Sequence, residues 1–423
     1  MRIIFYLNFL HFCLIFSQTD SLYLRLPDEI YLSDDSVFSV YYNNLIAEPL
    51  PDSLNFIAEC GTGYPDSMKF NLDSLVSGVY KLKLSITDSV SVLESDSSTI
   101  IVVKKTEFFN DTLNFLVIGD SYTYSGVYLK YIQDYYNNSS YYPMKYLGTN
   151  SYNGMYSNIF HEGYLGKYWY WFANYLESPF VFDYFGNVDF ARYISDSINN
   201  EIPDFIIIFL GLVDIGSANP ESIETIDEKI DSIFDATKMQ KLIGAIESAL
   251  PETRIGIVLT PPLNEREYTY TNPDLPNFLD RKKIHHRLVQ RYIDFFKEYN
   301  NANISVIPAY LNLDTYLGFD EFESIHPNNH GYSQIAQSIY GWIKYQLYDI
   351  GSEAEIKNLI ITVNRFSVDI SWEYPVRESI YNIYRSADPY SQFELIATTS
   401  NLYYTDTNIS GSKKYFYKIT AEN

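Results

Sequence analysis

The strongest signal for the fold is an apolar run that ends in a sharp polar turn, at residues 115–121. Phe115 to Ile118 are consecutive apolar residues, which is typical of a buried strand, and Gly119-Asp120-Ser121 follows at once. The turn predicts that Ser121 lies at the carboxyl end of a strand, where open α/β sheets bind their ligands. Gly, Asp and Ser are also ordinary turn residues, so the motif alone does not establish a site.

Strands alternate with helical patterns from about residue 110 to residue 350, which favours a mostly parallel sheet and an α/β fold. Helices are predicted at residues 223–250 and 279–299, and a last one from about 332 to 347. The last helix has an apolar stripe made of Ile335, Ile339, Ile343 and Leu347. The expected strands are Phe115 to Ile118, Met144 to Leu147, Phe205 to Leu210, Ile255 to Leu259 and Ile304 to Ile307.

A serine nucleophile needs a base, and His326 has the most suitable surroundings among the six histidines. Glu323 lies three residues before it, Pro327 follows it, and an amphipathic helix comes next. One short loop thus supplies both a base and a carboxylate that can orient it. Glu323, His326 and His330 are also potential metal ligands, but Pro327 breaks the helical spacing and no other cluster completes a site. We therefore predict neither a metal nor a cofactor.

Four separated motifs resemble those of the GDSL or SGNH hydrolases, over roughly Asn110 to Ile350. They are Gly119 to Thr123, His161 to Gly166, Gly211 to Asp214 and Glu323 to Pro327. The resemblance implies a flavodoxin-like three-layer α/β/α fold and serine esterase activity.

The resemblance also implies roles for individual residues. Ser121 would be the nucleophile, His326 the base and Glu323 the carboxylate of the triad, in place of the family's usual Asp. The N–H groups of Ser121 and Gly166, with Gly163 as second choice, would form the oxyanion hole. The family's oxyanion Asn is replaced by Val213, which cannot donate a hydrogen bond from its side chain, and losing one such donor typically costs about 10²- to 10³-fold in rate.

Three residues are predicted to contact the substrate: Tyr122 next to the nucleophile, Val213, and Trp169 in the aromatic run 168–172. The aromatic run favours either a platform on which a sugar ring stacks or the packing of the following helix, and packing is the commoner role.

Residues 1–18 resemble a signal peptide, because Arg2 precedes a short apolar core and Ser17 is a small residue for cleavage. A retained membrane anchor and a lipoprotein at Cys13 are the alternatives, but the core is short for a span and the residues before Cys13 are not small. The prediction is a secreted, periplasmic or cell-surface protein.

Two small β-sandwich domains are expected to flank the hydrolase domain, which we place at residues 106–350. Residues 19–105 predict an Ig-like sandwich, since Tyr80, Leu82, Leu84 and Ile86 alternate with polar residues. Residues 351–423 resemble a fibronectin type III module around Trp372. Only six of its seven strands can be assigned, so this module is expected to be incomplete.

Composition limits the partners. A formal charge of −23 argues against nucleic acid and anionic membranes, and no internal run approaches the length of a membrane span. After removal of the signal peptide only Cys60 remains, so no disulfide can form within the chain.

The sequence therefore predicts an exported esterase that removes acyl groups, acetyl above all, from a small-molecule or polysaccharide ester. The alternative is a weakly active or inactive carbohydrate- or surface-binding protein on the same fold, for which Val213 is the main argument.

Overall fold

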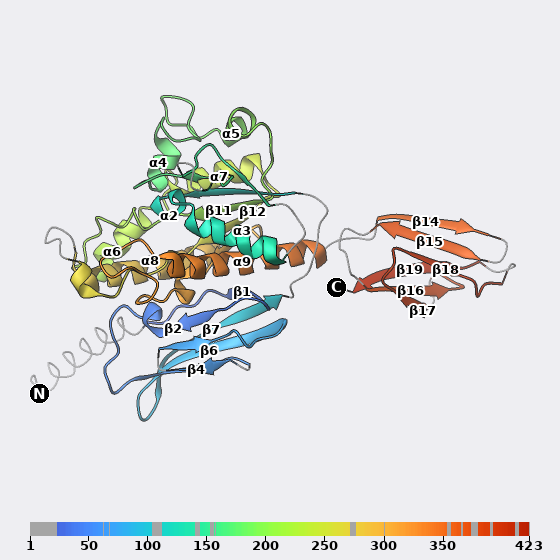
Figure 1. Cartoon of the computed structure of the whole chain (residues 1–423), viewed down its shortest axis with the longest axis horizontal. Coiled ribbons are helices and arrows are strands. Elements are labelled where there is room, and N and C mark those ends of the chain that lie inside the picture. Colours follow the sequence, from blue (N-terminus) through green and yellow to red (C-terminus); the bar gives the residue numbers. More distant parts are fainter. Residues whose placement is uncertain are drawn as a thin grey trace, which may run out of the picture. The chain divides into compact units, whose positions relative to one another are not determined.

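The computed structural model describes most of the chain and is shown in Figure 1. The described residues are 23–61, 63–66, 68–103, 112–139, 144–152, 156, 158–270, 276–299, 301–352, 357–364, 367–373, 380–389, 392–410 and 414–422. The expected signal peptide, with Arg2 and Cys13, lies outside these residues.

A parallel sheet forms the centre of the chain and confirms the mixed α/β prediction. Its strands run in the order β10-β8-β11-β12-β13, and β9 pairs with β8 beside β10. All the pairings are parallel. The bounds are β8 Leu113–Gly119, β9 Met144–Leu147, β10 Glu162–Gly163, β11 Phe205–Phe209, β12 Arg254–Val258 and β13 Ile304–Ile307.

The central strands are apolar because helices cover them. Every residue of β11 is buried, as are six of the seven residues of β8. The helices are α2 Ser121–Tyr124, α3 Val127–Ser139, α4 Trp169–Asn174, α5 Phe190–Ser197, α6 Ile223–Asp231, α7 Met239–Ala249, α8 Phe278–Glu298 and α9 Asn329–Ser352. The predicted stripe of α9 is confirmed, since Ile335, Ile339, Ile343 and Leu347 are all buried.

The long helix predicted at residues 223–250 is wrong, because the chain forms two helices there. A turn at residues 232–238 separates α6 from α7. In this turn the carboxylate of Asp235 accepts the backbone N–H of Thr237, 2.7 Å away. Such short-range bonds from an Asp side chain compete with the helical hydrogen bonds of the backbone.

The N-terminal strands form two sheets. Strands β1 Glu29–Ser33, β7 Val92–Val103, β6 Gly78–Thr87 and β3 Asn55–Glu59 form one, in that order. Strands β2 Ser39–Tyr41, β5 Lys69–Asn71 and β4 Tyr64–Pro65 form the other. The alternation predicted for β6 is confirmed in its middle, where Leu82 and Leu84 are buried and the lysines beside them are exposed.

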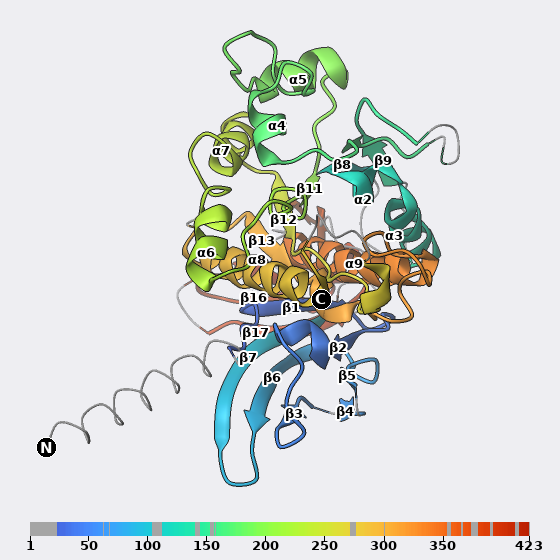
Figure 2. The same cartoon turned by 90° about the vertical axis from the view of Figure 1, so that its left-hand side faces the viewer.

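The N-terminal sheets pack on the α/β part rather than standing apart from it. Helices α8 and α9 lie between the central sheet and the strands β1 and β7 in both views (Figure 1, Figure 2). Gly341 of α9 approaches β1 so closely that a Cβ atom would lie 2.4 Å from the Tyr31 carbonyl oxygen. A side chain larger than hydrogen would therefore force α9 and β1 apart. One apolar core includes residues of both parts.

The short helix η2 (Tyr42–Leu45) makes a specific contact with the α/β part. Asn44 donates from Nδ2 to the carbonyl oxygens of Tyr310 and Leu313, both at 2.7 Å. The Leu45 carbonyl oxygen lies 2.8 Å from Nε2 of His286 on α8. These buried bonds fix the segment around η4 (Ala309–Asn312) and the amino-terminal half of α8 against η2.

The C-terminal strands are described by themselves, as a second compact unit. They form two three-stranded sheets around a small core that includes Trp372, Tyr381 and Ile383. Among the described residues, β19 pairs only with β16. The bounds are β14 Lys357–Val363, β15 Val368–Glu373, β16 Ile380–Ser386, β17 Glu394–Thr399, β18 Tyr403–Asp406 and β19 Phe416–Glu422.

Two further expectations concern cysteine and the membrane. Cys60 is buried and has a free thiol. Within the part of the chain that the structure describes, no helix is both long and apolar enough to cross a bilayer.

Candidate active site

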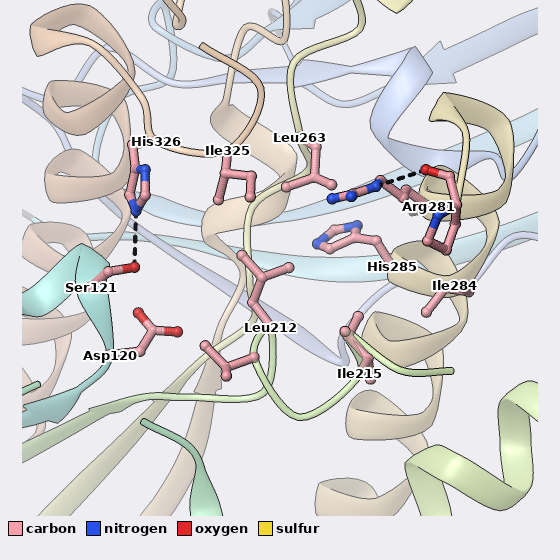
Figure 3. Close-up of a pocket in the computed structure, with 13 residues that line it drawn as sticks. Asp120, Ser121, Leu212, Ile215, Leu263, Arg281, Ile284, His285, Ile325 and His326 are labelled. Carbon is pink, nitrogen blue, oxygen red and sulfur yellow. Dashed lines mark hydrogen bonds between the residues drawn. The ribbon is translucent and has the colours of Figure 1, made fainter. Parts of the chain in front are cut away.

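Ser121 and His326, 205 residues apart in the sequence, meet at the carboxyl end of β8. Ser121 is the first residue of α2, and the side chain of Asp120 caps this helix by accepting the Tyr122 N–H at 3.0 Å. Nε2 of His326 lies 2.9 Å from Oγ of Ser121 (Figure 3). In the tautomer with its proton on Nδ1, His326 can accept the serine proton, so the pair has the geometry of a nucleophile and its general base.

Glu323 shapes the loop that carries His326. Its Oε1 accepts the backbone N–H groups of Ile325 at 3.0 Å and His326 at 3.2 Å, and it lies 3.6 Å from Nδ1 of His326. Burial acts to raise the pKa of Glu323, but the two backbone hydrogen bonds and the neighbouring His326 outweigh it and lower this pKa. The carboxylate is therefore ionised at neutral pH and can stabilise a protonated His326.

Tyr122, which was predicted to contact the substrate, is buried under the loop that carries His326. Its side chain is 1% exposed, and its hydroxyl donates to the Ile325 carbonyl oxygen at 2.6 Å. Its ring lies beside the His326 ring, with centroids 5.8 Å apart. Tyr122 therefore packs against the loop that carries His326 and is not accessible to a substrate.

The glycines predicted for the oxyanion hole lie in different surroundings. Gly163 pairs in register with Gly119, and its N–H donates to Nδ1 of His161 at 3.0 Å, so this donor is already used. Gly166 lies on an exposed turn at φ +65°, where a Cβ would meet nothing within 4 Å. Gly166 is not among the residues that line the cavity beside Ser121. Its part in the oxyanion hole stays a prediction.

Glu162, a buried residue of the second motif, holds three elements together, a role that the sequence analysis did not predict. Its carboxylate accepts the Thr149 N–H at 2.7 Å and the hydroxyls of Tyr164 and Tyr193 at 2.8 and 2.7 Å. Burial raises the pKa of Glu162, against these hydrogen bonds. The residue ties the loop after β9 and helix α5 to β10. A glutamate between a buried histidine and a glycine carries no pattern that would distinguish it from a surface residue.

Trp169, which was predicted to contact the substrate, packs in the core. The side chain is 0% exposed, and its Nε1 donates to the Tyr292 hydroxyl at 2.8 Å. Of the two roles weighed for the aromatic run, helix packing is the one that fits this burial.

A cavity of about 260 Å³ opens beside Ser121. Val213 lies in its wall, as do Ser121 and His326. Most of the remaining wall is apolar, and Arg281 contributes a guanidinium; these other lining residues are Asp120, Leu212, Ile215, Gly216, Leu263, Pro276, Arg281, Ile284, His285 and Ile325. The α8 residues of the wall, Arg281, Ile284 and His285, share one helix face, but nothing in the sequence indicated that this face turns toward Ser121.

Two buried carboxyl groups lie at the edge of the site. Burial raises the pKa of Asp120 to about 7. Burial and the nearby Asp120 together raise the pKa of Asp214, the last residue of the third motif, to about 7. Asp214 accepts the Trp169 N–H at 3.3 Å. Among the described residues, no group of three or more His, Cys, Asp and Glu side chains is placed to hold a metal ion.

Comparisons with known proteins give distant likenesses only. No family model and no curated protein matches the sequence. A carbohydrate esterase family 3 protein from Talaromyces cellulolyticus is similar at 16% identity and TM-score 0.35, over 56% of this chain and 99% of that one. An aryl esterase from M. smegmatis is similar at 13% identity and TM-score 0.29, over 55% and 99%. An Fn3-like protein from Clostridium thermocellum is similar at 27% identity and TM-score 0.15, over 16% and 72%. At these scores the function has to be argued from the site itself.

Proposed function

We propose that this protein is a serine hydrolase that cleaves carboxylic esters. Ser121 Oγ attacks the ester carbonyl carbon while Nε2 of His326 takes the hydroxyl proton, and the tetrahedral intermediate collapses as His326 returns that proton to the leaving alcohol. Water then repeats the two steps on the acyl-enzyme. Glu323 holds the His326 loop and stabilises the imidazolium that forms in each step.

One observation carries the proposal: the 2.9 Å contact between the serine Oγ and the imidazole Nε2 at the side of an apolar cavity. The oxyanion donors in this proposal are the N–H groups of Ser121 and Gly166, as in the SGNH hydrolases. The proposal includes their three-layer fold for residues 106–350, between an Ig-like and a fibronectin type III-like domain.

The rest of the substrate is inferred from context. An exported protein with accessory β domains fits an acylated carbohydrate, of which the alcohol part would project into solvent. His326 and Glu323 are 44% and 43% exposed, so a bulky alcohol can approach the triad. An aryl ester fits the apolar cavity equally well.

The rival proposal is a binding protein that has lost catalysis, and Val213 is the observation that favours it. A fluorophosphonate probe separates the two, because it reacts only with an activated serine. We expect mass spectrometry to find one adduct on the peptide that carries Ser121, and none after His326→Ala. Labelling that is absent, or that is as fast in His326→Ala, would favour the binding protein.

A further inference from the structure

The cavity beside Ser121 is larger than an acetyl group requires. Its volume is about 260 Å³. A methyl group would leave most of this space unfilled. The apolar walls, which include Leu212, Leu263 and Ile325, suit an aliphatic chain or an aromatic ring instead.

One cation interrupts this apolar lining. Arg281 lies in the first turn of α8 and lines the cavity, and Figure 3 shows its guanidinium directed away from α8, toward the side where Ser121 and His326 lie. Nε of Arg281 donates to the Pro276 carbonyl oxygen at 2.9 Å, and the Tyr270 ring centroid lies 5.4 Å from the guanidinium carbon. These two contacts fix the direction of the side chain.

The terminal nitrogens of Arg281 face the cavity. Within the described ranges, no carboxylate pairs with this guanidinium and no other acceptor takes a hydrogen bond from it. Asp120, the carboxyl group of the wall, forms no ion pair or hydrogen bond with Arg281 among the described residues. His285 is buried, its Nε2 lies 2.7 Å from the Thr260 carbonyl oxygen, and burial lowers its pKa to about 4, so it is neutral. Asp120 is held partly protonated at neutral pH by its burial.

We propose that the ester substrate carries an apolar portion that ends in a carboxylate, and that Arg281 binds this carboxylate while the apolar portion fills the cavity. This inference rests on the proposed ester hydrolysis and specifies its substrate. A guanidinium is the side chain whose paired N–H donors match a carboxylate, and such charged hydrogen bonds are strengthened in a cavity with apolar walls. The formal charge of −23 opposes an anion only at long range, because physiological salt screens charges beyond about 8 Å.

Two pairs of esters test the inference and locate the carboxylate. The acyl-side pair is the mono(4-nitrophenyl) ester of adipic acid and the same ester with its free carboxylate replaced by a carboxamide. The alcohol-side pair is 4-acetoxybenzoate and 4-acetoxybenzamide. In one of the two pairs we expect the wild-type kcat/KM to favour the carboxylate. Arg281→Gln should reduce that preference about 10- to 100-fold, chiefly through KM.

Lys283→Gln is the matched control, since it removes one positive charge from the same turn of α8 at a residue that does not line the cavity. It should keep the wild-type preference, and Arg281→Lys should keep part of it. The inference is overturned if the wild type prefers the carboxylate in neither pair, or if the Gln variants at 281 and 283 change the preference equally.

Calorimetry separates this inference from the proposed function. Each carboxylate ester is titrated into Ser121→Ala and into the double variant Ser121→Ala/Arg281→Gln. Tighter binding to the single variant supports the carboxylate site even if the wild type hydrolyses no ester. Equal binding to both overturns it, whether or not the wild type is an esterase.

Discussion

Asp120 should make the free energy of unfolding of the wild-type protein fall as the pH rises, and Asp120→Asn should remove this dependence. Burial raises the pKa of its carboxyl group from 3.8 to about 7, so the folded protein holds this proton more tightly than the unfolded chain does. Its contribution to stability is fully present below about pH 4 and is lost as the pH rises through about 7. The shift corresponds to about 4 kcal/mol in total, of which about 2 to 3 kcal/mol falls between pH 5 and 8.

Asparagine keeps the oxygen that accepts the Tyr122 N–H at 3.0 Å and is an equally good helix cap, but it does not titrate. The free energy of unfolding of Asp120→Asn relative to wild type should therefore rise by about 2 to 3 kcal/mol from pH 5 to pH 8. Any cost of the buried amide is the same at both pH values and cancels in this difference. The pKa of Asp214 should fall as well when the charge at position 120 is removed, which acts in the same direction.

Urea denaturation at several pH values measures the effect. Asp183→Asn is the matched control, because Asp183 does not titrate in this pH range. Hydrogen bonds from Asn187 lower the pKa of Asp183 below 3.8, so the stability that its carboxylate contributes is lost only below about pH 4. The difference between Asp183→Asn and wild type should therefore stay constant from pH 5 to pH 8. A difference between Asp120→Asn and wild type that stays constant from pH 5 to pH 8 would refute the reasoning.

Three further predictions follow from the site. Glu323→Gln should lower kcat about 10- to 100-fold, which is less than in a triad with a direct bond, because Oε1 of Glu323 lies 3.6 Å from Nδ1 of His326. An unchanged kcat in a steady-state assay would show that the loop is held without the charge. Val213→Asn places a hydrogen-bond donor in the cavity wall beside Ser121 and should raise kcat by up to about 10²-fold. An unchanged kcat in a folded variant would mean that another group already donates to the oxyanion. Asn44→Ala breaks two buried hydrogen bonds, to the carbonyls of Tyr310 and Leu313, and should lower the free energy of unfolding by about 2 to 4 kcal/mol. Asn43→Ala removes one exposed hydrogen bond to Glu265 and should lower it far less.

The sequence was most informative where one physical requirement dominates. A strand covered on both faces must be apolar throughout, so the run Phe205 to Leu210 could be predicted as a strand, which the structure places at Phe205–Phe209. The buried stripe of α9 follows from the 3.6-residue period. Ser121, His326 and Glu323 could be proposed as a triad because catalysis restricts the residue types and the loop 323–327 contains two of them.

The rest depends on tertiary packing, which residue patterns do not report. Tyr122 lies within the first motif and Trp169 shortly after the second, and only the fold shows that both are buried and hydrogen-bonded to other elements. Arg281 is one of several charged residues on α8, and its face toward the cavity is set by how that helix packs. The bond between Asn44 and η4 joins residues 266 positions apart, for which a single sequence carries no signal.

Hydrolysis of a short-chain 4-nitrophenyl ester by the wild type and by Ser121→Ala tests the central claim most directly. If Ser121 is the nucleophile that His326 activates, the wild type turns the ester over and Ser121→Ala falls to the rate of the buffer with small residual catalysis. Circular dichroism and the urea midpoint should be unchanged, since the Ser121 side chain bonds only to Nε2 of His326 among the described residues. Equal rates for the two folded proteins would contradict the account.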